Sequence, residues 1–235
     1  MAHKEKRRKK TLPLLLAALT LAGAGLWWGN YTLSVEEYAF SSSRLPPGWD
    51  GGRLVVLSDL HGRRFGRDNS RLAAAVEAAH PDAIALVGDF VDEWTDPAYL
   101  RPLLERLTAL APCYFVSGNH EWAAGKMQET AALLADCGVT WLHNGFVTLQ
   151  RGGDSLLLAG IDDPNGYADQ KTPQQVAREV RDAAPEGFWL LLAHRNNLFN
   201  GRYCRLGADL TFCGHAHGGI WRLPFTDGLV DTNLH

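Results

Sequence analysis

Two histidines separated by one residue stand between glycines in the run Cys213-Gly214-His215-Ala216-His217-Gly218-Gly219, directly after an apolar stretch. In an extended backbone, residues i and i+2 point to the same side, so both imidazoles can face one point beyond a strand end. Glycine reaches positive φ at little cost and lets the backbone pass close to an ion or a phosphate. The spacing therefore indicates metal-ligand chemistry, although a histidine pair by itself is more often structural.

Ligand-type side chains also follow other apolar runs of strand length. These are Asp59 and His61 after 53–57, Asp89 after 83–87, Asn119 and His120 after 113–116, and His194 after 188–193. Strands that alternate with helical stretches are typical of βαβ units, whose ligands bind beyond the carboxyl ends of the strands. Each residue alone could be a helix cap, a turn former or a core histidine. Together they favour a metal site, because a metal needs this many His, Asp and Asn groups.

This ordered set resembles the calcineurin-like metallophosphoesterase family, whose signature runs D-x-H, G-D, G-N-H-E, H and G-H-x-H. Here the motifs stand as Asp59-Leu60-His61, Gly88-Asp89, Gly118-Asn119-His120-Glu121, His194 and Gly214-His215-Ala216-His217. The resemblance begins near Arg53 and implies the fold class, which is α/β. The expected architecture is a four-layer α/β/β/α sandwich of two mixed sheets flanked by helices.

The resemblance also implies a role for each site residue. One divalent metal ion would be bound by Asp59, His61 and His217, a second by Asn119, His194 and His215, and Asp89 would bridge the two. His120 would stabilise the transition state or protonate the leaving oxygen, while Glu121 would fix the tautomer of an imidazole. Such ligands suit Mn, Fe or Zn, and the sequence does not choose among these metals. Two adjacent ions can lower the pKa of a shared water to about 7, which implies phosphoester hydrolysis by a metal-bridging hydroxide.

One departure from the family pattern bears on the substrate. Ser/Thr phosphatases of this superfamily continue the second motif as G-D-x-V-D-R-G, whereas this chain has Gly88-Asp89-Phe90-Val91-Asp92-Glu93-Trp94. The missing arginine argues against a phosphoprotein substrate, and the layout resembles bacterial enzymes that hydrolyse phosphodiesters or lipid pyrophosphates at the cell envelope. The leading hypothesis is a phosphodiesterase. A UDP-diacylglucosamine-type lipid pyrophosphatase and a truncated, non-catalytic module that binds metal or phosphate are the alternatives.

The N-terminus has the composition of a membrane segment. Seven of the first ten residues are Lys, Arg or His, and an uncharged stretch follows from Thr11 to Trp28. A basic flank, an apolar run and an aromatic end are typical of a single span with its N-terminus inside. A cleaved signal peptide is the alternative because Ala22-Gly23-Ala24 has the small-x-small form of a cleavage site. Either interpretation places the domain outside the cytoplasm; a buried N-terminal helix is a third interpretation.

The composition and the order of segments along the chain give the remaining expectations. The net charge of −3 over 235 residues indicates no nucleic-acid partner, and the four cysteines lack C-x-x-C spacing. The predicted organisation is a basic segment over 1–10, a membrane or signal segment over 11–28, a linker over 29–50 and a metallophosphoesterase domain over 51–235. We also expect an edge strand from Tyr31 to Phe40. Because the chain stops soon after His217, we expect an incomplete sheet, either because the sequence is a fragment or because a late strand is missing. The physiological substrate and the oligomeric state stay open.

Overall fold

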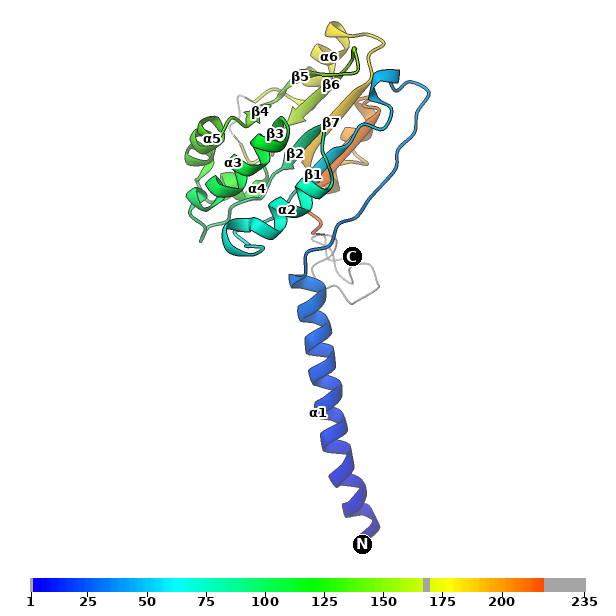
Figure 1. Cartoon of the computed structure of the whole chain (residues 1–235), viewed down its shortest axis with the longest axis vertical. Coiled ribbons are helices and arrows are strands. Elements are labelled where there is room, and N and C mark those ends of the chain that lie inside the picture. Colours follow the sequence, from blue (N-terminus) through cyan, green and yellow to red (C-terminus); the bar gives the residue numbers. More distant parts are fainter. Residues whose placement is uncertain (1, 167–169, 218–235) are drawn as a thin grey trace. The chain divides into compact units, whose positions relative to one another are not determined.

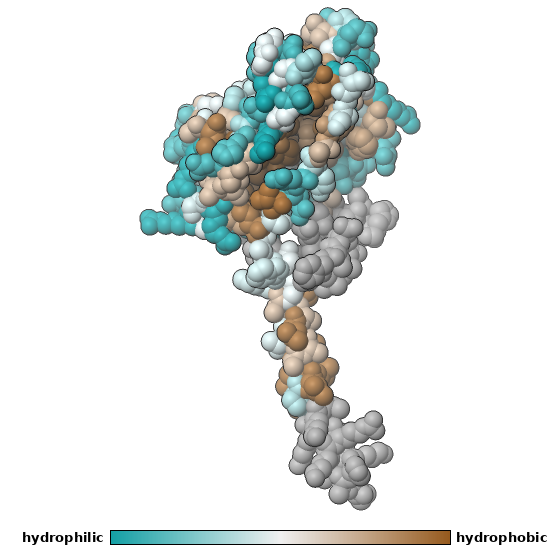
Figure 2. All heavy atoms as spheres, turned by 45° about the vertical axis from the view of Figure 1, so that its right-hand side comes forward, coloured by the Kyte–Doolittle hydropathy of each residue, from teal (hydrophilic) through white to brown (hydrophobic). Residues whose placement is uncertain are grey.

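The structure is a computed structural model that describes residues 2–166 and 170–217. It divides into a large unit, Val35–His215, and a smaller one that contains the N-terminal segment together with the chain from Ala216. The N-terminal segment forms helix α1, Ala2–Tyr31 (Figure 1). Its stretch Leu12–Gly29 has a mean hydropathy of 1.6 and is long enough to cross a membrane, a test that a signal sequence also passes. Apolar side chains cover its surface (Figure 2).

The first half of the large unit forms a four-stranded sheet of order β1-β2-β3-β4 in which every strand pair is parallel. Its strands are β1 Leu54–Leu57, β2 Ala83–Val87, β3 Cys113–Val116 and β4 Thr140–Trp141. The connecting helices are α2 Ser70–Ala78, α3 Arg101–Leu110, α4 Asn119–Ala123 and α5 Met127–Asp136. Parallel strands require these crossovers, and Figure 1 shows α2 and α3 over one face of the sheet.

The second half forms another four-stranded sheet, of order β5-β6-β7-β8. Its elements are β5 Gly145–Arg151, β6 Asp154–Ile161, α6 Pro173–Ala183, β7 Trp189–Arg195 and β8 Leu210–Gly214. β5 and β6 are antiparallel and the remaining pairs are parallel, so this is the mixed sheet. β5 and β6 form a hairpin whose turn contains Gly152 and Gly153, both at positive φ. A capping box between Thr172 and Gln175 begins α6.

The core lies between the two sheets. One buried cluster joins Val87 and Val116 of the first sheet to Leu158 and Leu192 of the second. A second cluster packs α6 through Val180 against the opposite face of the second sheet. Helices therefore cover the outer faces of two stacked sheets, which confirms the expected α/β sandwich.

Before β1 the structure differs from two expectations drawn from the sequence. The predicted edge strand is wrong, because Tyr31 ends α1 and residues 33–40 form no strand. Alternating apolar residues make a strand only where a neighbour supplies the ladder, and here Tyr38 remains 90% exposed. Part of the expected linker is packed: Trp49 belongs to the core between the sheets, and Arg44 pairs with Asp209 at 2.6 Å. The expectation of a missing late strand concerns residues 218–235, which lie outside the described residues.

The core between the sheets can be tested with one substitution. Leu158 is fully buried there, so Leu158→Ala is expected to lower the free energy of unfolding by about 2–5 kcal/mol. Leu110, which is 36% exposed at the end of α3, is the matched control, and Leu110→Ala should cost less than about 1 kcal/mol. Urea unfolding of the full chain in detergent measures both values. Equal losses would contradict the assignment of the core.

Candidate metal centre

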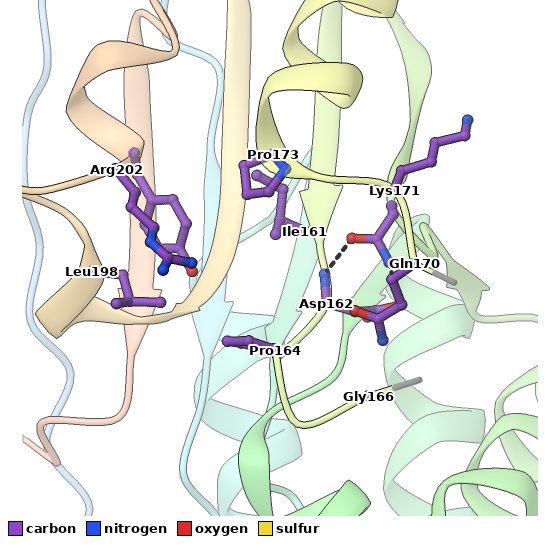
Figure 3. A pocket seen from close by; sticks show the side chains of 11 residues that line it. Ile161, Asp162, Pro164, Gly166, Gln170, Lys171, Pro173, Leu198 and Arg202 are labelled. Atoms are coloured by element: carbon purple, nitrogen blue, oxygen red, sulfur yellow. Dashed lines mark hydrogen bonds between the residues drawn. The ribbon is translucent and has the colours of Figure 1, made fainter. Parts of the chain in front are cut away.

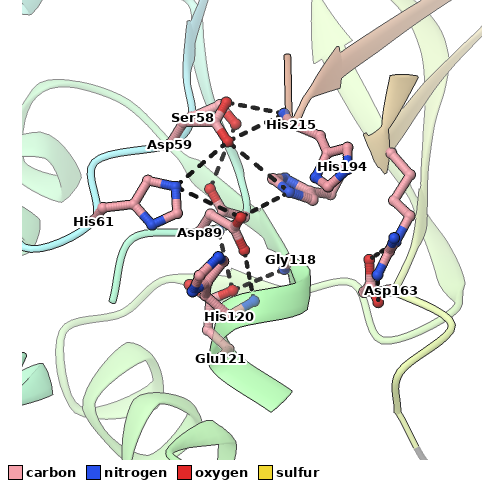
Figure 4. Close-up of polar contacts among 12 residues, drawn as sticks. Ser58, Asp59, His61, Asp89, Gly118, His120, Glu121, Asp163, His194 and His215 are labelled. Carbon is pink, nitrogen blue, oxygen red and sulfur yellow. Dashed lines mark hydrogen bonds and ion pairs between the residues drawn. The ribbon is translucent and has the colours of Figure 1, made fainter. Parts of the chain in front are cut away.

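The carboxyl ends of the parallel strands carry the polar side chains at one edge of the sandwich. Asp59 follows β1, Asp89 follows β2, Asn119 follows β3, and His194 and His215 belong to the ends of β7 and β8. Figure 4 shows Asp59, Asp89, His194 and His215 converging from both sheets, with His61 on one side of Asp89 and His194 on the other. The strand-end rule used for the sequence therefore brings distant residues together.

Asp89 lies at the centre of the cluster. Its Oδ2 is 3.0 Å from Nε2 of His194 and 3.7 Å from Nε2 of His61. Asp59 Oδ1 lies 3.9 Å from the same two nitrogens. Among the described residues of the large unit, two groups of potential ligand atoms each fit within 4.8 Å, namely His61-Asp89-His120 and Asp89-His194-His215. Asp89 is common to both groups, so it occupies the position that a bridging ligand requires.

The backbone at the cluster is strained. Asp59, His61, Asp89 and His215 have φ values of 57°, 45°, 57° and 69°, in the left-handed region that residues other than glycine rarely adopt. Each such residue costs on the order of 1–3 kcal/mol and persists only where the surrounding structure enforces it. Strain at these residues indicates that their loops are shaped to aim side chains and not to favour folding.

Glu121 enforces the backbone conformation at Asp89. Its carboxylate is completely buried and accepts hydrogen bonds from the N–H groups of Asp89 (3.0 Å), Phe90 (2.7 Å) and Gly118 (2.8 Å). It therefore binds the loop after β2 to the loop after β3. The role expected from the sequence was to orient an imidazole, and that expectation is wrong because these bonds go to backbone groups. Burial and the charge of Asp89 raise the pKa of Glu121 above its ordinary value.

Glycine permits the same two loops to approach each other. A Cβ at Gly118 would overlap the side chain of Asp89, and a Cβ at Gly88 would lie 2.5 Å from the backbone nitrogen of Gly118. Gly88 also has a φ of 75°. Both motifs therefore need glycine at these positions, because the two loops touch there. The sequence motif shows only the spacing of the glycines and not this contact.

The nitrogen atoms of His194 indicate that a cation belongs at the cluster. Nδ1 lies 2.8 Å from the carbonyl oxygen of Val87, which can only accept, so Nδ1 carries a proton. In the neutral ring Nε2 then presents a lone pair to the Asp89 carboxylate 3.0 Å away. Two such acceptors repel unless a proton or a metal ion lies between them. Asn119 Oδ1 is likewise buried with no hydrogen-bond partner among the described residues, so the donor set fits divalent metal ions.

The close packing of carboxylates and imidazoles shifts the pKa values of Asp89, His194 and His215. Burial acts to raise the pKa of Asp89, but its contacts with His194 and the N–H of His120 outweigh burial and hold that pKa below its ordinary value. Burial would lower the pKa of His194, yet Asp89 and then Asp59 raise it to about 9. Burial, followed by the charges of His194 and Arg195, lowers the pKa of His215. The cluster without metal therefore binds a proton where a metal ion would bind.

The structure brings together five of the seven predicted ligands, namely Asp59, His61, Asp89, His194 and His215. Asn119 begins α4 beside them. His217 belongs to the smaller unit, so its assignment as a metal ligand stays a prediction. His120 lies with its ring 4.6 Å from that of His61, in an edge-to-face arrangement. By distance alone His120 could also be a ligand, so its catalytic role stays a prediction.

Four neighbours of the cluster receive no role in the sequence analysis. Glu93 Oε1 lies 3.6 Å from Nδ1 of His120. Asp162 and Asp163 follow β6 and are both buried, and Asp163 pairs with Arg195 at 2.6 Å. The strand-end rule could have found the two aspartates, because they follow the apolar run 155–161 directly. Nothing in the local sequence indicates the partners of Glu93 and Arg195.

Comparison with known proteins agrees with this site. Residues 52–219 match the calcineurin-like phosphoesterase family, and the chain belongs to that family. It is 30% identical to a transmembrane protein with metallophosphoesterase domain from Danio rerio, over 90% of this chain and 50% of that protein. It is 26% identical to the uncharacterized metallophosphoesterase YkuE of Bacillus subtilis (92% and 77% covered) and 29% identical to phosphodiesterase YaeI of Escherichia coli (73% and 63% covered). The chain spans about half the length of the first of these relatives.

The raised pKa of His194 makes metal binding depend on pH. Below about pH 9 the metal-free ring holds a proton that a metal ion must displace. Apparent affinity for Mn²⁺ should therefore rise as pH rises towards 9 and level off above it, with about one proton released at pH 7.5. Calorimetric titration in buffers of different ionisation enthalpy measures the release. His80→Gln, at an exposed histidine outside the cluster, should release the same number; a buffer-independent heat would contradict the prediction.

Proposed function

We propose that this chain is a dinuclear metal-dependent phosphoesterase that hydrolyses phosphodiesters. The observation that carries the proposal is the position of Asp89, whose carboxylate is shared by two groups of potential metal ligands. Asp59, His61 and His217 would bind one ion, Asn119, His194 and His215 the other, and Asp89 both. When bound, two such ions acidify a water molecule and neutralise phosphoryl oxygens.

His120 is the residue that would act on the leaving oxygen. Its backbone N–H donates to Asp89 Oδ1 at 2.8 Å, which fixes the start of α4 against the cluster. Its ring is about one-third exposed, and Nδ1 faces Glu93. The Glu93 carboxylate, 3.6 Å from Nδ1, would orient the ring, so that His120 could give a proton to the departing alkoxide.

Glu93 also supports the choice of a diester substrate. It occupies the place of the arginine in the Ser/Thr phosphatase pattern, so a negative charge replaces a positive one near the leaving group. A phosphodiester carries one negative charge and a phosphomonoester carries about two near neutral pH, so the diester is repelled less. The relative from Escherichia coli is named a phosphodiesterase, which is consistent with this choice.

Two variants test the mechanism. Asp89→Asn should remove bound Mn²⁺ and hydrolysis of bis(p-nitrophenyl) phosphate together, because Asp89 is common to both ligand groups. His120→Ala should keep the metal and lose about 10²–10⁴-fold in kcat, with the larger loss for a diester that has a poor leaving group. Metal content and turnover are measured on the full chain in detergent. Asp136→Asn is the control, since its side chain is 64% exposed on α5. Turnover by Asp89→Asn after chelation would refute the proposal.

A lipid-linked substrate is the second candidate, and Trp94 is the observation that favours it. Its side chain is 91% exposed on the loop that carries Glu93. Lys126 holds this loop by donating to the carbonyl oxygens of Asp92, Glu93 and Thr95. A fixed, exposed indole near the leaving-group side suits an apolar substrate or a membrane surface.

This candidate predicts a difference between substrates. Trp94→Ala should lower kcat/KM for a lipid-linked phosphodiester in vesicles and leave that for a soluble aryl diester unchanged, because only the lipid would contact the indole. Turnover of both substrates by the full chain in the same vesicles measures the difference. Equal effects on the two substrates would eliminate the lipid-linked candidate.

The membrane topology belongs to the same proposal. A basic N-terminus followed by an apolar helix favours a single span with the metal-binding domain outside the cytoplasm. Two curated relatives, from Danio rerio and Bos taurus, are named transmembrane proteins. Secretion after signal cleavage is the alternative topology.

A further inference from the structure

A buried ion pair lies beside the metal cluster and plays no part in binding metal. Asp163 follows β6 and its side chain is fully buried. Its Oδ2 accepts from Nε of Arg195 at 2.6 Å, and its Oδ1 accepts from Nη2 of Arg195 at 3.2 Å and from the N–H of Asn165 at 2.8 Å. This two-point contact fixes the plane of the guanidinium group.

Arg195 directly follows the predicted ligand His194, and an irregularity in β7 aims the pair. Leu192 pairs with Phe212 and Arg195 pairs with Gly214, so two residues of β7 stand opposite one residue of β8. Such a bulge re-aims side chains at the end of a strand. In Figure 4 Asp163 lies on the same side of the cluster as His194, opposite His61. The guanidinium, bound to Asp163, is therefore held on the His194 side of the cluster.

The charge of Arg195 reaches the cluster. The hydrogen bond to Asp163 is the main cause of the raised pKa of Arg195, and Asp89 adds to it. The same guanidinium helps to lower the pKa of His215, after burial and the charge of His194. Arg195 thus acts on ligands of both sheets, at a position where incoming anions approach.

Most of the donor capacity of Arg195 is unused. A guanidinium has five N–H groups, and Asp163 takes two of them. No other described residue accepts a hydrogen bond from the remaining three, and the side chain is 20% exposed to solvent. A fixed, charged and partly exposed fork of donors is the arrangement that proteins use to bind phosphate.

We propose that Arg195 is a phosphate-binding residue whose free N–H groups donate to a non-bridging oxygen of the phosphoryl group at the metal centre. The inference rests on the proposed function and names a specificity residue for it. It also accounts for the second motif, where Glu93 stands in place of the arginine of the Ser/Thr phosphatases. Arg195, at the end of β7, supplies the positive charge on the His194 side of the cluster. Glu93 contacts His120 instead.

Inorganic phosphate is the probe, because it presents the recognised oxygens without requiring turnover. Calorimetric binding of phosphate to the Mn²⁺-loaded full chain in detergent should weaken roughly 10- to 100-fold in Arg195→Gln, since a charge-assisted contact is lost. Arg195→Lys should give an intermediate Kd, because an ammonium keeps the charge and can still pair with Asp163 but lacks the planar fork. Bound Mn²⁺ should be unchanged in both variants.

Arg202→Gln is the matched control. Arg202 lines a separate cavity of about 340 Å³ with Leu198, Pro164 and Pro173, and its side chain points into that cavity (Figure 3). The control removes one positive charge from the same half of the chain and should leave the phosphate Kd within twofold. An equal loss in this variant would show that net charge alone attracts phosphate, and would overturn the proposal.

The remaining outcomes separate this inference from the proposed function. A purely structural ion pair predicts that Arg195→Gln lowers Tm while the phosphate Kd stays within twofold of the native value, which would refute the inference. If the native chain hydrolyses no phosphoester but loses phosphate binding in Arg195→Gln, the subsite stands and the enzyme proposal fails. If hydrolysis is present and its kcat/KM is unchanged in both Arg195 variants, the enzyme stands and the inference fails.

Discussion

One buried carboxylate, that of Glu121, holds the parts of the metal centre together. It accepts N–H groups from the loop after β2 and from the loop after β3, and it has no exposure to water. A buried charge is tolerated only where its hydrogen bonds are complete, so the loops must keep the conformation that supplies these donors. That conformation places Asp89 between the histidines. Strain at Asp89 persists because its loop is fastened in this way, and the N–H groups of Asp59 and His61 donate in turn to the carbonyl oxygens of Gly88 and Asp89.

A second carboxylate fastens the two sheets to each other at the same edge. Asp162 follows β6 of the second sheet, and its Oδ1 accepts from the N–H and the hydroxyl of Ser117, at the end of β3, both at 2.8 Å. It also accepts from Trp141 Nε1 at 2.9 Å, at the end of β4. Ligands from the two sheets can share Asp89 only if the sheets keep a fixed offset, and this network of satisfied polar groups supplies it.

Repulsion between neighbouring lone pairs explains why this site suits metal ions. The Asp89 carboxylate lies 3.0 Å from Nε2 of His194, and this proximity raises the pKa of His194. Their lone pairs repel each other unless a proton or a metal ion lies between them, so the arrangement favours a bound cation. The neighbouring Asp163–Arg195 pair extends positive charge to the side of the cluster where phosphate would arrive.

Much of the site could be predicted from local pattern. The strands, the hairpin and the start of α6 follow from apolar periodicity, turn glycines and a capping box, which act within a few residues. The strand-end rule then located Asp59, Asp89 and His194 at one edge. Local pattern failed from Tyr31 to Phe40, because an apolar alternation becomes a strand only beside a partner. It also failed for Glu121, whose role depends on backbone groups some thirty residues away.

The sequence by itself determined which side chains are available as ligands, in what order and at which strand ends, because these are properties of short segments. Only the tertiary structure decided that Asp89 is shared between two ligand groups, that Glu121 fastens two loops and that Arg195 is held by Asp163. Each of these depends on contacts between segments that are distant in the chain. Such contacts are set by how the two sheets stack and by which buried charges find partners there, and no short segment encodes them.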